Sequence, residues 1–563
     1  MSFTDPSTPI RSLTGDDAAS DGSDYNVNPY RSLNDNIHGQ YRLPKKYFDI
    51  IDTEQFQRLR NLMQLGCAYY VFPSASHNRF EHSLGVGYLA NTLLGRLQRE
   101  QRLDFDNPRQ ATHLLNSVTI AGLCHDLGHG PFSHVFDGQF IPRARPGCSW
   151  THEDASEMML DDLVDKNYID IDGENGFDVE LIKELIQGQR SAKFQHIPRY
   201  IYQIVANESS GVDVDKFDYI NRDCHNVGLK TSYDFGRLMD SARVVNDEIT
   251  FPQKEVFNLY EMFHTRYSLF KRIYTHRVGT SIEYMVVDAM LLADQALGIS
   301  SSIDRADTYL SMTDSVLDDI VRAASAPRCS ANYVGAREAQ CDGSKVSSPE
   351  ELARSAARVG SPHAQQLAEA RGIIRNIRQR NHYRFVGELF FSREIFNKLK
   401  KTPNIAGEIA SFGSSNSLAA DDVVVDFSAI HYGMRDQNPV ERIKFYNRLD
   451  INKVAHIPQI QVSPLIPKVF EECRVRVFAR RPDNFVHVQT ALAKWVKHCY
   501  PQVAEEQLNF ALMAPPDYTP SRSTGPRTPS SSERVHTSPS VRRSPASASS
   551  PPTSQMLFSE HNS

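Results

Sequence analysis

The stretch IAGLCHDLGHGPFSH, residues 120–134, places three histidines and an aspartate within an apolar frame. Upstream of it, Leu114, Val118 and Ala121 recur at the spacing of one helical face. His125 comes four residues after Ala121, so the face that buries these aliphatic side chains also turns this imidazole inward. The spacing therefore predicts a helix that carries a metal-binding or proton-binding group into the core.

Two other segments have the same design. His82 shares a predicted helical face with Val86 and Leu89, and Asp215 shares one with Tyr219. A buried imidazole or carboxylate without a partner is costly, whereas convergence on one divalent cation neutralises carboxylates and uses neutral imidazoles. Taken singly, each histidine is more often an ordinary core or surface residue. Taken together, the three segments predict a metal site between helices.

Composition narrows the class of protein around such a site. The 563 residues carry a formal net charge of -6, which gives no global attraction to nucleic acid. The eight cysteines contain no CxxC pair, which favours a reducing compartment. There is no apolar N-terminal leader and no run of about 18 apolar residues, so we expect no membrane span and no secretion. The expected location is nuclear, cytosolic or both.

The sequence divides into five parts. Long amphipathic segments predict a mostly helical core over 31–321, and stretches such as DDVVVDFSAIHY and CRVRVFARR predict a smaller α+β lobe over 363–513. Between them, 322–362 is rich in Ala, Ser, Gly and Pro and is expected to be a flexible, exposed insertion. The polar arm 1–30 and the Ser/Pro-rich tail 514–563 are expected to be disordered.

The order H…HD…D, with a histidine at 82, the pair at 125 and 126 and an aspartate at 215, is the signature order of the HD superfamily of metal-dependent phosphohydrolases. Longer stretches extend this likeness, among them IDTEQFQRLRNLMQLGCAYYVFPSASHNRFEHSLGVGYLA, VDVDKFDYINRDC and NLYEMFHTRYSLFKRIYTH. With them the chain resembles the animal SAM-and-HD-domain deoxynucleoside triphosphate (dNTP) triphosphohydrolases. No SAM domain is expected upstream of residue 31.

The resemblance implies an HD-domain phosphohydrolase core and three different roles for its polar residues. The implied metal ligands are His82, His125, Asp126 and Asp215, for Zn, Fe, Mn or Mg. The implied catalytic group, which positions water and protonates the leaving oxygen, is His129, His134, Asp137 and His152. The implied substrate residues are Gln64, Leu65, Arg79, Lys216, Tyr219, Asp223, Arg266 and Tyr274. Thr275 departs from the family, which has a longer amide there that reaches toward the base.

The implied reaction releases deoxynucleoside and inorganic triphosphate, with control of dNTP pools and an antiviral role as further expectations. Two alternatives stay open at this point. One is another HD activity, either a nucleotidase or a cyclic-nucleotide phosphodiesterase, which would release a different product. The other is a single-stranded nucleic-acid-binding protein, which basic pieces such as KLKK and VRRSP favour and the acidic net charge opposes.

The resemblance also implies two activator sites in a homotetramer. The residues of a guanine-nucleotide site, for GTP or dGTP, are Arg31, Asp52, Gln57 and Arg60. The residues of a neighbouring dNTP activator site, built across subunits, are Asn34, Val71, Phe72, Arg237, Lys254, Asn258, His276 and Arg277. Pro252 replaces a basic residue of the family near this second site, which would weaken its hold on a phosphate.

The tail contains DYTPSR, in which Thr519 precedes a proline and a basic residue. Cyclin-dependent kinases accept this pattern, and the family carries a regulatory threonine at the matching place. Because Ser-Pro and Thr-Pro pairs are common in any tail of this composition, an unmodified tail is the alternative. Phosphate would add about -1.5 to -2 charges at pH 7, and we expect it to act on assembly rather than on chemistry.

Overall fold

The structure is a computed structural model. It describes residues 29–103, 108–170, 176–325, 362–413 and 418–512. The predictions for the N-terminal arm, for nearly all of the insertion and for the tail with Thr519 lie outside the described residues. No helix among the described residues is long and apolar enough to cross a membrane.

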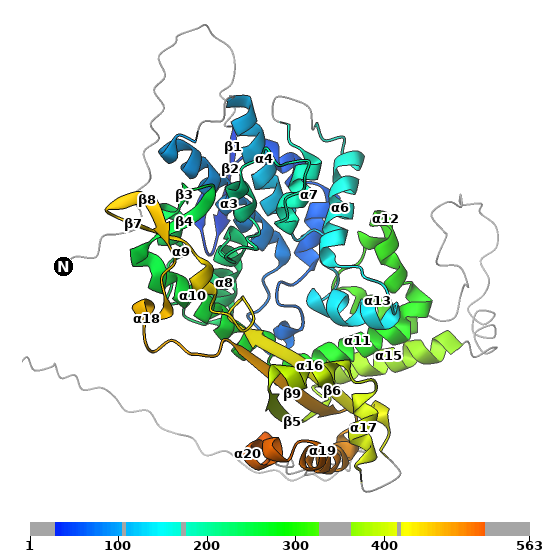
Figure 1. Cartoon of the computed structure of the whole chain (residues 1–563). Helices are drawn as coiled ribbons and strands as arrows, with labels where there is room; N and C mark the ends of the chain where they lie inside the picture. The colour runs from blue at the N-terminus through cyan, green and yellow to red at the C-terminus, as the bar shows by residue number, and fades with distance from the viewer. Residues whose placement is uncertain (1–28, 104–107, 171–175, 326–361, 414–417, 513–563) are drawn as a thin grey trace, which may run out of the picture. The chain divides into compact units, whose positions relative to one another are not determined.

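Helices dominate the described chain, so the predicted mostly α class is confirmed (Figure 1). The helices and helical turns before residue 326 are η1 Lys45–Tyr47, α1 Phe48–Ile51, α2 Glu54–Gln57, η2 Arg58–Asn61, η3 Gly66–Tyr70, α3 Arg79–Gln101, α4 Pro108–Cys124, η4 Phe136–Phe140, α5 Ile141–Ala144, α6 His152–Lys166, α7 Val179–Gln187, η5 Arg199–Gln203, α8 Val214–Val227, α9 Phe235–Ser241, η6 Gln253–Glu255, α10 Val256–Leu269, η7 Phe270–Tyr274, α11 Arg277–Leu297, η8 Ser300–Asp304, α12 Ala306–Tyr309 and α13 Val316–Ser325. Those that follow are α15 Pro362–Arg378, α16 Arg393–Lys401, α17 Ile405–Ser411, η9 Ala420–Asp422, η10 Pro439–Arg442, α18 Gln459–Val462, η11 Pro482–Asn484, α19 Phe485–Cys499 and α20 Pro501–Ala511.

The strands form three small sheets. Their bounds are β1 Tyr30–Asp35, β2 Gly39–Pro44, β3 Arg243–Val245, β4 Glu248–Pro252, β5 Arg384–Phe391, β6 Val423–His431, β7 Phe445–Asn447, β8 Asp450–Ala455 and β9 Glu471–Ala479. β1 and β2 make an antiparallel hairpin, and a second sheet has the order β3-β4-β7-β8 with β4 and β7 parallel. In the third sheet β9 lies between β5 and β6 and is antiparallel to both.

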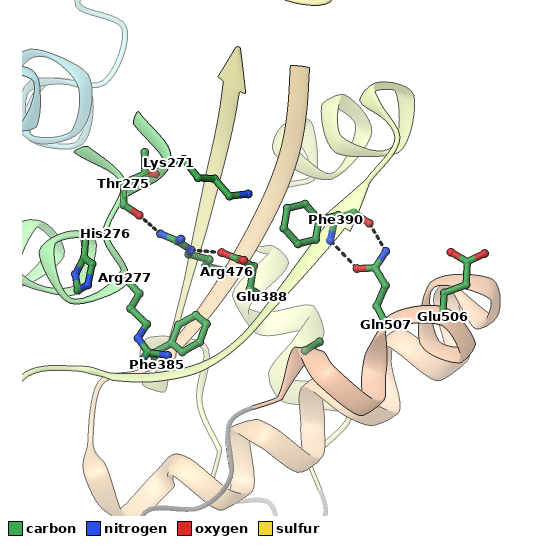
Figure 2. A pocket seen from close by; sticks show the side chains of 11 residues that line it. Lys271, Thr275, His276, Arg277, Phe385, Glu388, Phe390, Arg476, Glu506 and Gln507 are labelled. Atoms are coloured by element: carbon green, nitrogen blue, oxygen red, sulfur yellow. Dashed lines mark hydrogen bonds and ion pairs between the residues drawn. The ribbon is translucent and has the colours of Figure 1, made fainter. Parts of the chain in front are cut away.

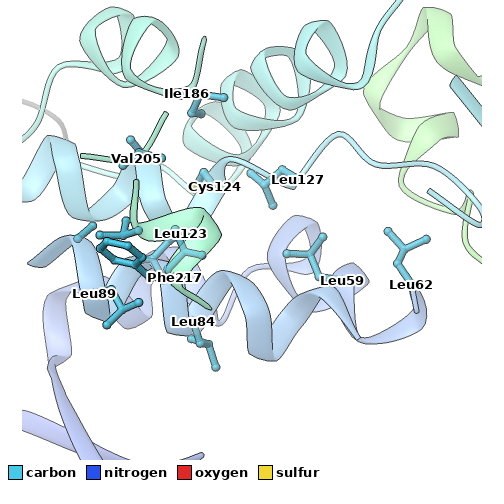
Figure 3. Packing of buried hydrophobic residues seen from close by; sticks show 14 of the residues in the cluster. Leu59, Leu62, Leu84, Leu89, Leu123, Cys124, Leu127, Ile186, Val205 and Phe217 are labelled. Carbon is cyan, nitrogen blue, oxygen red and sulfur yellow. The ribbon is translucent and has the colours of Figure 1, made fainter. Parts of the chain in front are cut away.

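Helices α3 and α4 lie in close contact because glycines face each other across them. A Cβ atom at Gly87 would stand 2.6 Å from the Leu123 side chain, and one at Gly122 would stand 3.2 Å from the Cα of Gly87. Leu89 and Phe217 fill the space beside this contact (Figure 3). The tight approach matters for function, since α3 carries His82 and α4 leads directly into the HD pair.

Local capping fixes where the helices of the site begin. The side chain of Asn78 accepts from the backbone at the start of α3, and the side chain of Asp213 does so at the start of α8. Thr151 and Asp154 form a reciprocal capping box at the start of α6. His152 is therefore the first residue of its helix, held at a defined position.

Two parts of the predicted lobe over 363–513 pack on the helical core instead of on the C-terminal sheet. α15 buries Ala370 and Ile374 in the core cluster, against α11 and α13. Phe445 of β7 pairs with Phe251 of β4 and is buried in the same cluster. Only the β5-β9-β6 sheet with α16, α17, α19 and α20 has a separate core, built around Trp495. An apolar stripe identifies a buried face but not its partner, which is why sequence alone assigned these segments to the lobe.

Candidate functional site

Three helices deliver the four predicted metal ligands to one point. The two histidine Nε2 atoms, of His82 and His125, lie 3.2 Å apart. Asp215 Oδ1 is 3.2 Å from the first of these nitrogens and 3.5 Å from the second, and Asp126 Oδ1 is 3.4 Å from the second. His82, His125 and Asp215 form a group that could hold a divalent cation, and Asp126 adds a second carboxylate beside it. The predicted convergence is present.

The charges at this cluster attract cations. Burial lowers the pKa of His82, but the hydrogen bonds to Asp215 and Asp218 outweigh it and raise that pKa to about 10. Burial raises the pKa of Asp215, but hydrogen bonds from the two histidines outweigh it and hold that pKa below its usual range. The carboxylates therefore stay ionised over the whole neutral range. The negative charge that favours protonation of the neighbouring histidines also favours the binding of a metal ion at this place.

A buried carboxylate that the sequence analysis missed orients one ligand. Asp218 Oδ2 is 2.8 Å from His82 Nδ1, so the other ring nitrogen of this histidine turns toward the cluster. The second oxygen of Asp218 lies 2.6 Å from His38 Nε2, and Arg222 donates to both oxygens. Asp218 follows Asp215 by three residues on α8, so helical spacing offered a signal for its position on the same face.

Arg79, for which the resemblance implies contact with a substrate phosphate, has partners within the chain. It donates to Asp126 and to Ser133 Oγ. Burial raises the pKa of Asp126, but Arg79 outweighs it and holds that pKa well below its usual range. Arg79 thus keeps a ligand carboxylate charged, and it still lines the cavity described below.

The four predicted catalytic residues form a second cluster beside the first. His152 Nδ1 lies 2.6 Å from Asp137 Oδ2, and the rings of His129 and His152 stack with centroids 4.1 Å apart. His134 Nδ1 is 3.7 Å from the other oxygen of Asp137, and its side chain is 75% exposed. Asp137 and His152, both in the implied catalytic group, thus form a close pair in the structure.

The protonation of these histidines differs. Burial lowers the pKa of His152, but its hydrogen bond to Asp137 outweighs burial and raises that pKa. Burial and the nearby Arg79 charge lower the pKa of His129 well below its usual range. The two stacked histidines thus have pKa shifts in opposite directions, an arrangement suited to general acid and base chemistry.

A cavity of about 720 Å³ opens onto both clusters. It is lined by all eight predicted substrate residues, Gln64, Leu65, Arg79, Lys216, Tyr219, Asp223, Arg266 and Tyr274. Asp213, which was not predicted, accepts from Lys216 Nζ at 2.8 Å. The Tyr274 hydroxyl donates to Asp223, whose other oxygen is 2.7 Å from His77 Nε2.

Thr275 lines the same cavity but does not extend into it as a longer amide would. Its hydroxyl donates to the Phe270 carbonyl of its own helical turn. Glu283 and Gln139 also line the cavity and were not predicted, and burial raises the pKa of the Glu283 carboxyl to about 8. Neither residue belongs to the H…HD…D pattern or to the residue sets that the resemblance implies, so neither was expected at the cavity.

The residues implied for a guanine-nucleotide site gather near the start of the described chain. Arg31 of β1 donates to Asp52 at 2.7 Å, and both side chains are about half exposed. Arg60 Nε donates to Gln57 Oε1 at 2.8 Å, while Gln57 Nε2 donates to a backbone carbonyl. These charged and amide groups therefore satisfy one another at the surface.

The residues implied for the dNTP activator fall into three groups. Arg237 and Asn258 both contact Glu255, close to Lys254 on η6. The rings of Phe72 and His276 pack edge to face, with Val71 and Arg277 as their chain neighbours, and Asn34 lies on β1. Pro252 ends β4, two residues before Lys254.

Comparison with known proteins supports the reading of the clusters. Residues 79–189 match the HD domain family. Over 468 residues the chain is 38% identical to "Deoxynucleoside triphosphate triphosphohydrolase SAMHD1 homolog" of Dictyostelium discoideum. This alignment covers 83% of this chain and 80% of that protein. It is 38% identical to "Deoxynucleoside triphosphate triphosphohydrolase SAMHD1" of Bos taurus, over 80% of this chain and 75% of that protein. It is 37% identical to the Homo sapiens protein of that name, over 81% and 72% respectively.

Proposed function

The chain belongs to the SAMHD1 family of HD-domain deoxynucleoside triphosphate triphosphohydrolases, and on that premise we propose that its cavity splits a dNTP into deoxynucleoside and inorganic triphosphate. The observation that carries the proposal is the meeting of two clusters in one cavity. One is a donor set for a divalent cation, and the other is a group of histidines ordered by Asp137. A divalent cation can polarise a phosphoryl oxygen and a histidine can transfer the proton, so both kinds of group serve the hydrolysis of a phosphoester.

His82, His125, Asp126 and Asp215 would hold the cation. A divalent metal bound there supplies Lewis acidity toward a phosphoryl oxygen and lowers the pKa of water. Which of Zn, Fe, Mn or Mg serves is left to metal analysis, because the donor set accepts all four.

The protein's own groups bind and orient the substrate. Lys216 and Arg266 bring positive charge to the cavity for a triphosphate, and Arg79 adds to the local field while it holds Asp126. Tyr274, fixed by its bond to Asp223, offers a wall for the sugar. A close wall at this place discriminates against a 2′-hydroxyl by shape.

The histidine cluster handles protons. The contact with Asp137 favours the protonated form of His152, and His152 or the exposed His134 donates a proton to the departing 5′ oxygen. His129 is neutral and buried beside Asp126, so it serves in orientation and as an acceptor. This division follows from the opposite pKa shifts of the stacked pair.

Regulation is the finer part of the proposal. GTP or dGTP would bind at Asp52, Gln57, Arg60 and Arg31, and a dNTP at the second set around Lys254 and His276, across subunits of a homotetramer. The exposure and mutual pairing of Arg31 and Asp52 support this, since such a pair exchanges easily for a ligand. Phosphorylation of Thr519 by a cyclin-dependent kinase, a nuclear or cytosolic location, control of dNTP pools and an antiviral role complete the proposal.

The test is product analysis. Purified protein is incubated with each dNTP, with and without GTP and a divalent metal, and the products are separated by anion exchange. We expect deoxynucleoside and inorganic triphosphate, and no product from the Asp215→Ala variant. Release of orthophosphate or pyrophosphate instead would assign the chain another HD hydrolase activity. Salt-sensitive RNA binding without any turnover would favour the nucleic-acid-binding alternative.

A further inference from the structure

One face of the helix that carries Arg266 and Tyr274 is attached to the C-terminal sheet. Along α10 and η7, Tyr267, Lys271 and Thr275 recur every four residues, which places them on one side of the helix. Both Tyr267, at 2.7 Å, and Lys271 donate to Glu472 of β9. The sheet therefore contacts the substrate-binding helix along its length.

Thr275, the third residue on this side of the helix, is contacted by Arg476, which lies four residues after Glu472 on β9. Its guanidinium donates to the backbone carbonyl of Thr275 and, through Nε, to Glu388 of β5 (Figure 2). The residue is only 5% exposed. Glu388 thus fixes the direction of the guanidinium, and the guanidinium fixes a carbonyl 201 positions away in the sequence.

The carbonyl that Arg476 contacts lies where the helix ends. η7 is a π-helical turn in which the Thr275 amide donates to the Phe270 carbonyl, and α11 begins at Arg277. The final carbonyls of a helix have no amide partner within it and carry partial negative charge. A buried guanidinium at this point satisfies one such carbonyl and stabilises the helix end.

Tyr274 precedes the anchored carbonyl by one residue. Its hydroxyl bonds to Asp223 inside the cavity, and Thr275 itself lines that cavity. The Thr275 carbonyl belongs to the peptide between Thr275 and His276, so its displacement would turn the backbone directly after Tyr274 and shift the Tyr274 ring relative to Asp223. Shifts of about 1 Å in a binding wall can change rates by two orders of magnitude.

We propose that Arg476 is a positioning residue for substrate binding, which acts through the Thr275 carbonyl on the place of Tyr274 in the cavity. The proposal rests on the proposed function, since it assigns Tyr274 to the substrate wall. Arg476 itself lines a separate cavity of about 590 Å³, behind Thr275, and it makes no direct contact with the clustered metal ligands in the hydrogen bonds and ion pairs described.

The chain offers a matched control on the same strand and the same face. Arg474 is 1% exposed, donates to Ser428 Oγ at 3.1 Å and lies 3.4 Å from Glu388, so its bonds remain within the sheet. Arg474→Met and Arg476→Met both remove a buried guanidinium from β9. Only the second removes a donor to the substrate-binding helix.

The experiment measures equilibrium binding of a dNTP analogue with an α,β-imido bridge to the full chain, together with KM and kcat for the natural dNTP. We expect Arg476→Met to weaken analogue binding and raise KM by about tenfold or more, with metal content unchanged. Arg474→Met should stay within about twofold of the parent, and Arg476→Lys should restore part of the loss. Equal losses in the two methionine variants, or none in a folded Arg476→Met, would overturn the proposal.

A double-mutant cycle keeps the test valid if Arg476→Met folds poorly. Arg476→Lys is combined with Tyr274→Phe, and each protein is first checked by thermal unfolding. If Arg476 acts through Tyr274, its effect on KM shrinks in the Tyr274→Phe background, whereas additive effects contradict the proposal. A parent that binds the analogue but releases no inorganic triphosphate would refute the proposed function alone, because the binding comparison would still report on Arg476.

Discussion

The candidate metal cluster and the region proposed to bind a guanine nucleotide both contain paired charged groups but differ in burial. In the cluster, His82 is 1% exposed and is oriented from behind by Asp218. At the surface, Arg31 and Asp52 are 50% and 55% exposed and contact each other. An exposed pair of this kind contributes little to stability, while a buried charge that loses its partner is costly. The first region is thus held together by buried contacts within the chain, whereas the exposed contacts of the second could be exchanged for those of the proposed nucleotide at little cost.

The largest expected effect comes from breaking the buried region. Asp215→Ala removes the carboxylate that contacts both ligand histidines, so metal content and turnover should fall to background while the helical content stays near that of the parent. Metal analysis by mass spectrometry, circular dichroism and the product assay check this. A variant with parental metal content and full activity would remove the site from these residues.

A smaller effect is expected at Asp218, which contacts the candidate ligand His82 but is not itself a candidate ligand. Asp218→Asn keeps the shape but weakens the orientation of His82, and metal affinity should fall by about 10–100-fold. Competition with a chelator of known affinity measures it. Asp422→Asn is the control, since Asp422 is also a buried carboxylate with an arginine partner but lies in the C-terminal part of the chain. Equal metal affinities in the two variants would show that Asp218 has no such role.

The exposed region should respond in activation without any change at the metal. Asp52→Ala should raise the GTP concentration needed for activation about tenfold or more, because a hydrogen bond to a charged group contributes ~1.5–3 kcal/mol. Metal content should stay parental. Asp49→Ala, an exposed carboxylate three residues earlier, serves as control. If Asp52→Ala forms the same oligomers with GTP and dNTP as the parent does, the activator site lies elsewhere.

The smallest effect is expected in the pH profile. Asp137 raises the pKa of His152, so the imidazolium form persists to higher pH than in a free histidine. Asp137→Asn removes that charge, and the alkaline limb of kcat should move to lower pH by about one unit. Glu153→Gln, which changes a more distant and more exposed carboxylate near the same ring, should shift it less. An alkaline limb that does not move would exclude His152 as the proton donor.

Helical spacing was sufficient to predict that His82, His125 and Asp215 turn inward, and the resemblance implied the eight substrate residues that line the cavity but not Asp213, Gln139 or Glu283. Spacing did not identify Asp218 as a partner of His82, because the two lie 136 positions apart and periodicity reports a buried face without naming what it meets. The contact between Arg476 and Thr275 was missed for the same reason.

Prediction from sequence is weakest where a segment could pack against either of two cores. Ile374 of α15 and Phe445 of β7 have the apolar pattern that any core would accept, and the structure places both in the helical core. Their sequence neighbours in β5 and β6 belong to the sheet. Which of the two nearby cores each segment joins depends on contacts with residues far away in the sequence, so no local sequence pattern predicts it.

The contact between Arg476 and the end of η7 joins two segments that are synthesised at different times on the ribosome. All four candidate ligands have been synthesised once α8 is complete, and domains fold as they emerge, the N-terminal parts first. The strand that anchors Thr275 is made much later. A nascent chain therefore carries all four candidate metal ligands during a period when the Thr275 carbonyl has no anchor.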